Sequence, residues 1–291
     1  MKKLFFPIVI GVVSVAAGCV TTNAHWDQAG FHQDHYGWEV PYLAGQKRLV
    51  GADWKLDNYH YDTAAGRLMP KEGNDYVAYV REDEDGDGRI EYNEKQRIFL
   101  YDLRFVHARN NGVIWVQTFR VPLSDADRDL DVVLANYADS LAGTGLNWQG
   151  TIFNLSVPRT RSFTVFVNDK KETKVGLYPA QEALIELAET SRLQLNKEER
   201  SLKLRVVLSK FSYLEESRPE MMNSANARSV NVNGNTFKQR TAVILIGYVN
   251  DPDHFESGVG DFEDFRGRLR WHPRAAAGRP AALPKTETPI R

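Results

Sequence analysis

The chain has a single cysteine, Cys19, and no second thiol with which it could pair. A disulfide within the chain and a cysteine-ligated zinc site are therefore both excluded. After residue 17 there is no apolar run of the roughly 18 residues that a membrane-spanning helix needs, so no such span is expected there. A net charge of −1 gives no basic surface for nucleic acid, and no nucleic-acid partner is expected.

The common catalytic signatures are also missing. We find no G-x-S-x-G nucleophile elbow, no H-E-x-x-H zinc helix, no G-x-x-x-x-G-K-[ST] phosphate loop and no S-x-x-K pair. Scattered carboxylates could still form a glycosidase pair, because separation in space cannot be read from spacing in the sequence. The sequence favours a role without catalysis but leaves enzymatic activity open.

The N-terminus has the pattern of an export signal. Lys2 and Lys3 precede an apolar run at 4–17, which is too short to span a bilayer, so we expect a signal peptide at 1–18. The segment "VAAGC" at 15–19 resembles the lipobox of bacterial lipoproteins. That resemblance implies that Cys19 carries diacylglycerol and a fatty acid such as palmitate. If the host is Gram-negative, with a periplasm, the residue after the cysteine favours an anchor in the outer membrane; the sequence specifies neither the host envelope nor the face of the membrane. The alternative is an ordinary secretory signal, with Cys19 as a bystander.

The mature chain divides into three parts. Residues 19–70 form a lipidated and aromatic-rich N-terminal segment, 71–271 an α+β domain, and 272–291 a Pro- and Ala-rich tail that is expected to be disordered. The aromatic side chains of the first part could form a sugar-stacking platform or could pack on the main sheet. The histidines of "HQDH" at 32–35 have a spacing that can chelate a metal on a helical turn, although surface or packed histidines are the favoured explanation.

Apolar periodicity predicts a mostly antiparallel sheet with hairpins and about three packing helices. Asn111-Gly112 predicts a hairpin turn in which both residues have positive φ. We expect strands at 75–80, 99–105, 113–121, 201–211 and 240–249, a hairpin within 163–178, helices at 124–143, 179–193 and 251–271, and a long loop at 215–239. The helix at 124–143 would be capped by Ser124 or Asp125. The element order over 110–271 faintly resembles the sandwich of the PsbP and Mog1 proteins.

An acidic stretch carries the strongest chemical signal. "REDEDGDGRIEYNEK" at 81–95 places seven carboxylates within fifteen residues. From Asp83 onward it resembles the calcium-binding loop of EF-hand proteins, with Gly88 at the sharp bend. The expected Ca²⁺ ligands are Asp83, Asp85, Asp87, the backbone carbonyl of Arg89, Glu91 and Glu94. The alternative is a metal-free acidic turn.

The loop also departs from the EF-hand family. A complete EF-hand has a helix on each side, whereas "DYVAYV" at 75–80 predicts a strand before the loop, and no second loop follows. Switch-like opening depends on paired helices, so a structural calcium clip is expected. Together these features predict a lipid-anchored, calcium-binding cell-envelope protein that binds or scaffolds an envelope protein or glycan. The alternative is a calcium-stabilised envelope hydrolase acting on polysaccharide or peptidoglycan.

Overall fold

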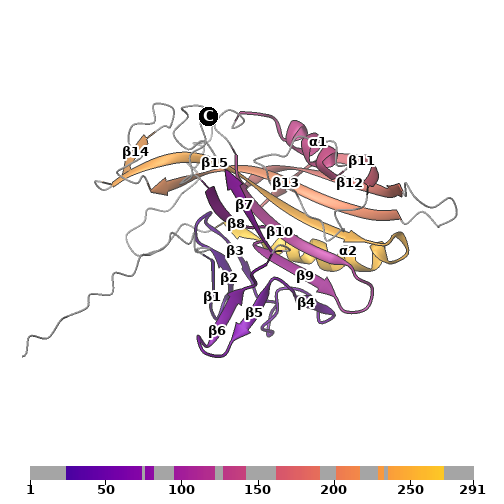
Figure 1. Ribbon diagram of the computed structural model, residues 1–291, viewed down its shortest axis with the longest axis horizontal. Helices are drawn as coiled ribbons and strands as arrows, with labels where there is room; N and C mark the ends of the chain where they lie inside the picture. The colour runs from indigo at the N-terminus through magenta and orange to yellow at the C-terminus, as the bar shows by residue number, and fades with distance from the viewer. Residues whose placement is uncertain are drawn as a thin grey trace, which may run out of the picture.

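The fold is built around one large antiparallel sheet (Figure 1). The computed structural model describes residues 24–73, 76–81, 95–121, 127–141, 162–190, 201–216, 229–232 and 235–271. In order across the sheet lie β11 (Ser162–Val175), β12 (Tyr178–Thr190), β13 (Ser201–Glu216), β15 (Asn235–Asn250), β10 (Val113–Arg120), β9 (Leu103–His107) and β4 (Trp54–Leu56), with β14 (Ser229–Val232) beside β15. The prediction of a mostly antiparallel sheet agrees with this arrangement.

Strand β15 occupies the centre of the sheet, between β13 and β10, as its continuous apolar sequence predicted. Alternate side chains belong to two different core clusters: Val243 and Leu245 pack on one face, Ile244 and Ile246 on the other. A strand covered on both faces needs an apolar residue at every position, which explains the run "TAVILIGYV".

One helix covers each face of the sheet, so the molecule has three layers. Helix α1 (Leu130–Leu141) and helix α2 (Pro252–Arg268) lie above and below the long strands in Figure 1. The buried side chains are Val133, Leu134, Tyr137 and Ala138 on α1, and Phe255, Phe262 and Phe265 on α2. Both helices were predicted, although α1 begins at Leu130 and the expected caps Ser124 and Asp125 lie outside the described residues. Neither described helix has the length and apolar character needed to cross a bilayer.

The aromatic-rich N-terminal segment packs on the same face as α2. Within this segment, β1 (Ala24–Trp26), β2 (Gly30–Gln33) and β3 (Trp38–Pro41) form a small antiparallel sheet that β16 (Arg270–Trp271) extends, and β5 (Tyr59–Asp62) pairs with β6 (Arg67–Pro70). Farther along the chain, β7 (Val77–Arg81) and β8 (Lys95–Phe99) form another small antiparallel pair. Phe31 and Trp38 are fully buried in the cluster that contains the α2 phenylalanines. Arg268 of α2 donates hydrogen bonds to the carbonyls of Pro41 and Leu49. These contacts favour packing over a sugar platform as the role of these aromatic side chains.

The third predicted helix, at 179–193, is wrong. Residues 178–190 form β12, which pairs with β11 and β13. Ala183, Ile185 and Leu187 alternate into the core cluster beneath α1, while Glu182 and Leu184 face the other side. The residues Ala, Glu and Leu favour a helix only weakly, and two flanking strands and a covered face override that preference. The prediction of about three packing helices is therefore wrong: the described part of the chain has two.

The hairpin predicted at Asn111-Gly112 is present, but its turn differs. Strands β9 and β10 pair as expected, with His107 N–H donating to the Gly112 carbonyl at 2.8 Å. Of the two turn residues only Asn111 has a positive φ, 57°. A Cβ atom at 112 would lie 2.8 Å from Asn250 Nδ2, so a larger residue there needs the Asn250 side chain to shift.

Three further boundaries differ from the sequence predictions. The hairpin predicted within 163–178 is almost entirely the single strand β11, interrupted by an irregularity where Asp169 has φ 46°, and the chain reverses only at Gly176. The strand predicted at 99–105 is divided between the end of β8 and β9. The loop predicted at 215–239 contains the end of β13, all of β14 and the start of β15.

A cluster of charges fastens α2 to the sheet. The side chain of Glu182 is only 3% exposed, and its carboxylate contacts Arg205 Nε at 2.7 Å, Lys171 Nζ at 3.0 Å and Arg266 Nη1 at 2.6 Å. Glu263 of α2 contacts both arginines at 2.6 Å. Burial alone would raise the pKa of Glu182, but its three cationic partners together hold that pKa below the ordinary value.

A second buried carboxylate, Asp102, joins the N-terminal sheet to β10. Gln33 Nε2 donates to Asp102 Oδ1 at 2.5 Å, and Thr118 supplies further hydrogen bonds. Trp38 Nε1 in turn donates to Thr118 Oγ1 at 3.1 Å. Burial raises the pKa of Asp102 to about 6, because no cation is among the groups that offset the loss of water.

Candidate metal centres

The predicted calcium loop lies between two paired strands. Asp83, Asp85, Asp87, Arg89, Glu91 and Glu94 are themselves outside the described residues, as is Cys19. Strands β7 and β8 pair antiparallel from Val77 opposite Phe99 to Arg81 opposite Lys95. The strand predicted before the loop is thus confirmed. Arg81 and Lys95, the described residues on either side of 82–94, are direct cross-strand partners, and such partners have Cα atoms about 5 Å apart.

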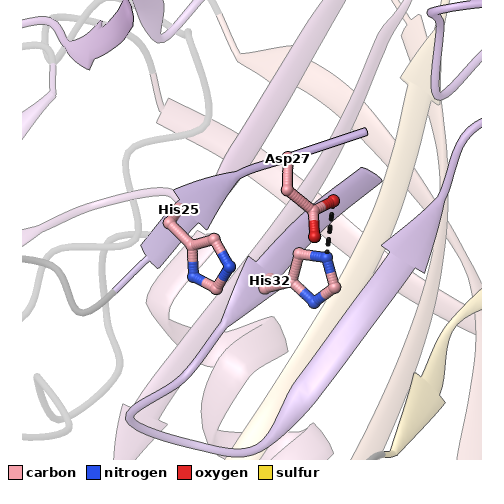
Figure 2. Close-up of side chains that lie close together, drawn as sticks. All are labelled: His25, Asp27 and His32. Carbon is pink, nitrogen blue, oxygen red and sulfur yellow. Dashed lines mark ion pairs between the residues drawn. The ribbon is translucent and has the colours of Figure 1, made fainter. Parts of the chain in front are cut away.

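A second group of possible ligands lies within the described chain, on the β1–β2 hairpin. Cross-strand pairing places His25 opposite His32, and Asp27 follows directly after β1 (Figure 2). One ligand atom from each of these residues lies within 4.8 Å of the other two. His32 Nε2 is 3.0 Å from Asp27 Oδ1, the contact that is dashed in Figure 2.

The "HQDH" spacing pointed to the wrong histidine pair. His32 belongs to strand β2, so His35 does not share a helical turn with it. The ring of His35 packs instead against Tyr36 and Tyr213, at centroid distances of 4.6 and 5.2 Å. The pair that does meet, His25 and His32, flanks the turn "DQAG", and its proximity depends on the hairpin register. The sequence signal that could have identified this pair is a histidine on each side of a four-residue segment that begins with Asp and ends with Gly, which is typical of a turn.

Carboxylates surround both histidines. His25 Nδ1 is 2.6 Å from Asp34 Oδ2, and His32 Nδ1 is 3.1 Å from Glu39 Oε2. The two imidazole rings stack, with centroids 4.7 Å apart and planes inclined by 9°. His32 is 13% exposed, whereas the His25 side chain is 51% and Asp27 46% exposed. The cluster is therefore anchored on its His32 side and open to water on the other.

Asp27 is held in place by the turn itself. Its Oδ1 accepts hydrogen bonds from the N–H groups of Ala29 at 2.7 Å and Gly30 at 3.1 Å. Partial burial raises the pKa of Asp27, but these two N–H groups and His32 lower it by more, so the net pKa lies below the ordinary value. The side chain is a carboxylate at neutral pH, as a metal ligand must be.

Comparison with known proteins adds little. No protein family and no curated protein matches the chain. Among solved structures, the cyanobacterial PsbP protein (CyanoP) from Synechocystis sp. PCC 6803 is similar with a TM-score of 0.32 and 10% sequence identity, over 78% of this chain and 98% of that one. PsbP is also one of the two proteins that the element order over 110–271 resembles. A TM-score this low carries no argument about function.

Proposed function

We propose that the chain is a lipid-anchored, calcium-binding protein of the cell envelope that binds or scaffolds other envelope components. The observation that carries this proposal is the loop "DEDGDGRIEYNE", whose sequence has a full set of calcium ligands. The residues on either side of this loop are paired in the β7–β8 hairpin. The lipobox-like "VAAGC" supports the anchor and the envelope location.

Calcium would act as a clip at this hairpin. The carboxylates of the loop repel one another, and an oxygen-seeking divalent cation turns that repulsion into attraction. Strand pairing already holds both ends of the loop, which lowers the entropy lost when the ligands converge. Sensor EF-hands signal by changing the angle between two helices, and the strands at this loop offer no such pair. The proposed role of the ion is therefore structural.

The anchor would keep the folded domain close to the membrane. Ala24, the first residue of β1, is five positions beyond Cys19 in the sequence. A chain spans at most about 3.5 Å per residue, so five residues reach no more than about 18 Å. Partners must then be found at the membrane surface, which favours other outer-membrane proteins or the glycan layer facing them.

The contacts of the buried carboxylates favour a binding role over hydrolysis. Glu182 is engaged by three cations, and Asp102 by Gln33 and Thr118. A glycosidase needs a carboxylic acid and a carboxylate facing one substrate-sized space. Among the described residues, these two carboxylates with shifted pKa values are thus occupied in holding the fold together.

The anchor is tested by labelling cells with a fatty acid and separating their membranes. The wild-type protein is expected to carry the label and to leave the membrane only with detergent, whereas Cys19→Ser should lose the label. An unlabelled wild-type protein would contradict the lipid anchor.

The binding role is tested by cross-linking intact cells and purifying the protein from solubilised membranes, with calcium or with a chelator. A discrete partner should be recovered with calcium and lost with Glu94→Gln, while Glu72→Gln, outside the loop, should retain it. Release of fragments from purified peptidoglycan by the wild-type protein would instead favour the hydrolase.

A further inference from the structure

The geometry of the β1–β2 hairpin points to a second metal site, independent of the calcium loop: His25, Asp27 and His32 bind one Zn²⁺ ion. Two imidazoles and a carboxylate are the ligand set that zinc accepts, whereas calcium and magnesium select oxygen ligands only. The three residues are brought together by the pairing of His25 with His32 and by the turn that follows β1.

The proposed ion would lie between the side chains of His32 and Asp27. The two facing atoms, Nε2 and Oδ1, are 3.0 Å apart. Ligands of a tetrahedral zinc ion lie about 3.4 Å apart, because the zinc–ligand bonds are about 2.0–2.1 Å long. Zinc can therefore be accommodated between these atoms with only a small outward shift of Asp27.

Each histidine already has the outer carboxylate that zinc sites characteristically provide. Asp34 contacts the Nδ1 atom of His25, and Glu39 contacts the Nδ1 atom of His32. A carboxylate at Nδ1 keeps the proton on that nitrogen, directs Nε2 towards the metal and increases its basicity. For His32, the nitrogen directed in this way is the one that faces Asp27.

His25 is the ligand that moves. A metal bound to an imidazole nitrogen lies in the plane of the ring, and the stacked rings occupy nearly parallel planes. One ring must turn before both can share an ion. His32 is held between Asp27 and Glu39 and is 13% exposed, whereas His25 is half exposed on a short N-terminal strand. Turning His25 leaves the fourth zinc position facing water.

The proposal is tested by titrating Zn²⁺ into the purified, demetallated protein in millimolar calcium, so that the acidic loop does not compete for zinc. We expect one zinc ion per chain. His25→Ala and Asp27→Asn should each weaken binding at least tenfold, since each removes one of three ligands. His60→Ala, an exposed histidine on β5, is the matched control and should bind zinc as the wild type does.

The two test variants are chosen to keep the hairpin folded. His25 is exposed, and an asparagine at 27 retains the side-chain oxygen that accepts hydrogen bonds from Ala29 and Gly30. Circular dichroism of each variant checks this directly. Cobalt added in place of zinc should give the intense visible bands of a low-symmetry site in the wild type and in His60→Ala only. Equal zinc affinity in His25→Ala, Asp27→Asn and His60→Ala, or no saturable binding in the wild type, would overturn the proposal.

Discussion

Replacing Asp102 with asparagine should stabilise the protein at neutral pH. Burial raises the pKa of this carboxyl from 3.8 to about 6, so the folded protein binds the Asp102 proton more tightly than the unfolded chain does. The stability that this proton contributes is complete below about pH 4 and is lost as the pH rises through 6. Asparagine is similar in shape, carries no charge and can still hydrogen bond with Gln33 and Thr118.

The magnitude follows from the shift. Each pKa unit corresponds to about 1.4 kcal/mol, so a shift of about two units makes the buried carboxylate cost about 3 kcal/mol of unfolding free energy above pH 6. The difference in unfolding free energy between Asp102→Asn and the wild type should therefore be near zero at pH 4. It should grow to about 3 kcal/mol at pH 7.

Denaturant unfolding followed by tryptophan fluorescence measures this difference at pH 4, 5, 6 and 7. All other titrating groups are common to both proteins and cancel, so the difference curve reports Asp102 alone. A difference that does not change between pH 4 and pH 7 would refute the reasoning. So would a variant that is less stable than the wild type at pH 7.

Two other predictions concern the contacts that hold α2. Glu182→Ala should destabilise the fold by about 3 kcal/mol, because it removes the buried carboxylate that Lys171, Arg205 and Arg266 share. Breaking the exposed pair of Asp53 with Arg109 by Asp53→Ala should change stability by less than about 0.5 kcal/mol. Equal losses in urea unfolding would show that burial of the cluster has no effect. In the same helix, Gly258→Ala should lower the melting temperature, because the added Cβ would lie 2.3 Å from the Tyr248 hydroxyl. Gly260→Ala should raise the free energy of unfolding by up to about 1 kcal/mol, because alanine favours a helix more than glycine does and no atom lies within 4 Å of the added Cβ. The same sign for both would contradict the packing described here.

The elements that the sequence predicted well are those whose local pattern and tertiary setting agree. Strand β15 is apolar from Ala242 to Val249 and is covered there on both faces. Helix α2 combines a proline at its start with a helical phenylalanine stripe. Strand β12 failed because its local composition and its setting disagree. In β12, Glu182 belongs to an ion-pair cluster whose other members lie on β11, β13 and α2, and nothing in the sequence of β12 itself indicates those partners.

The candidate sites divide in a similar way. A calcium loop is a local motif, so its ligands at 83, 85, 87, 91 and 94 could be proposed from spacing alone. The histidine site is made by cross-strand register, which the sequence does not specify until the hairpin turn at Asp27 is placed. For that reason the sequence suggested His32 with His35, whereas the structure brings His32 to His25.

Calcium binding by the purified, demetallated protein tests the central claim most directly, measured by titration calorimetry together with the shift in melting temperature. A single loop without a partner should bind one ion with a dissociation constant on the order of 0.1 to 1 mM. At tenfold excess over that constant, calcium should stabilise the fold by about 1.4 kcal/mol. Asp83→Ala and Glu94→Gln should abolish both effects, and magnesium should reproduce them poorly. Neither heat of binding nor a shift in melting at millimolar calcium would show that "DEDGDGRIEYNE" is only an acidic turn.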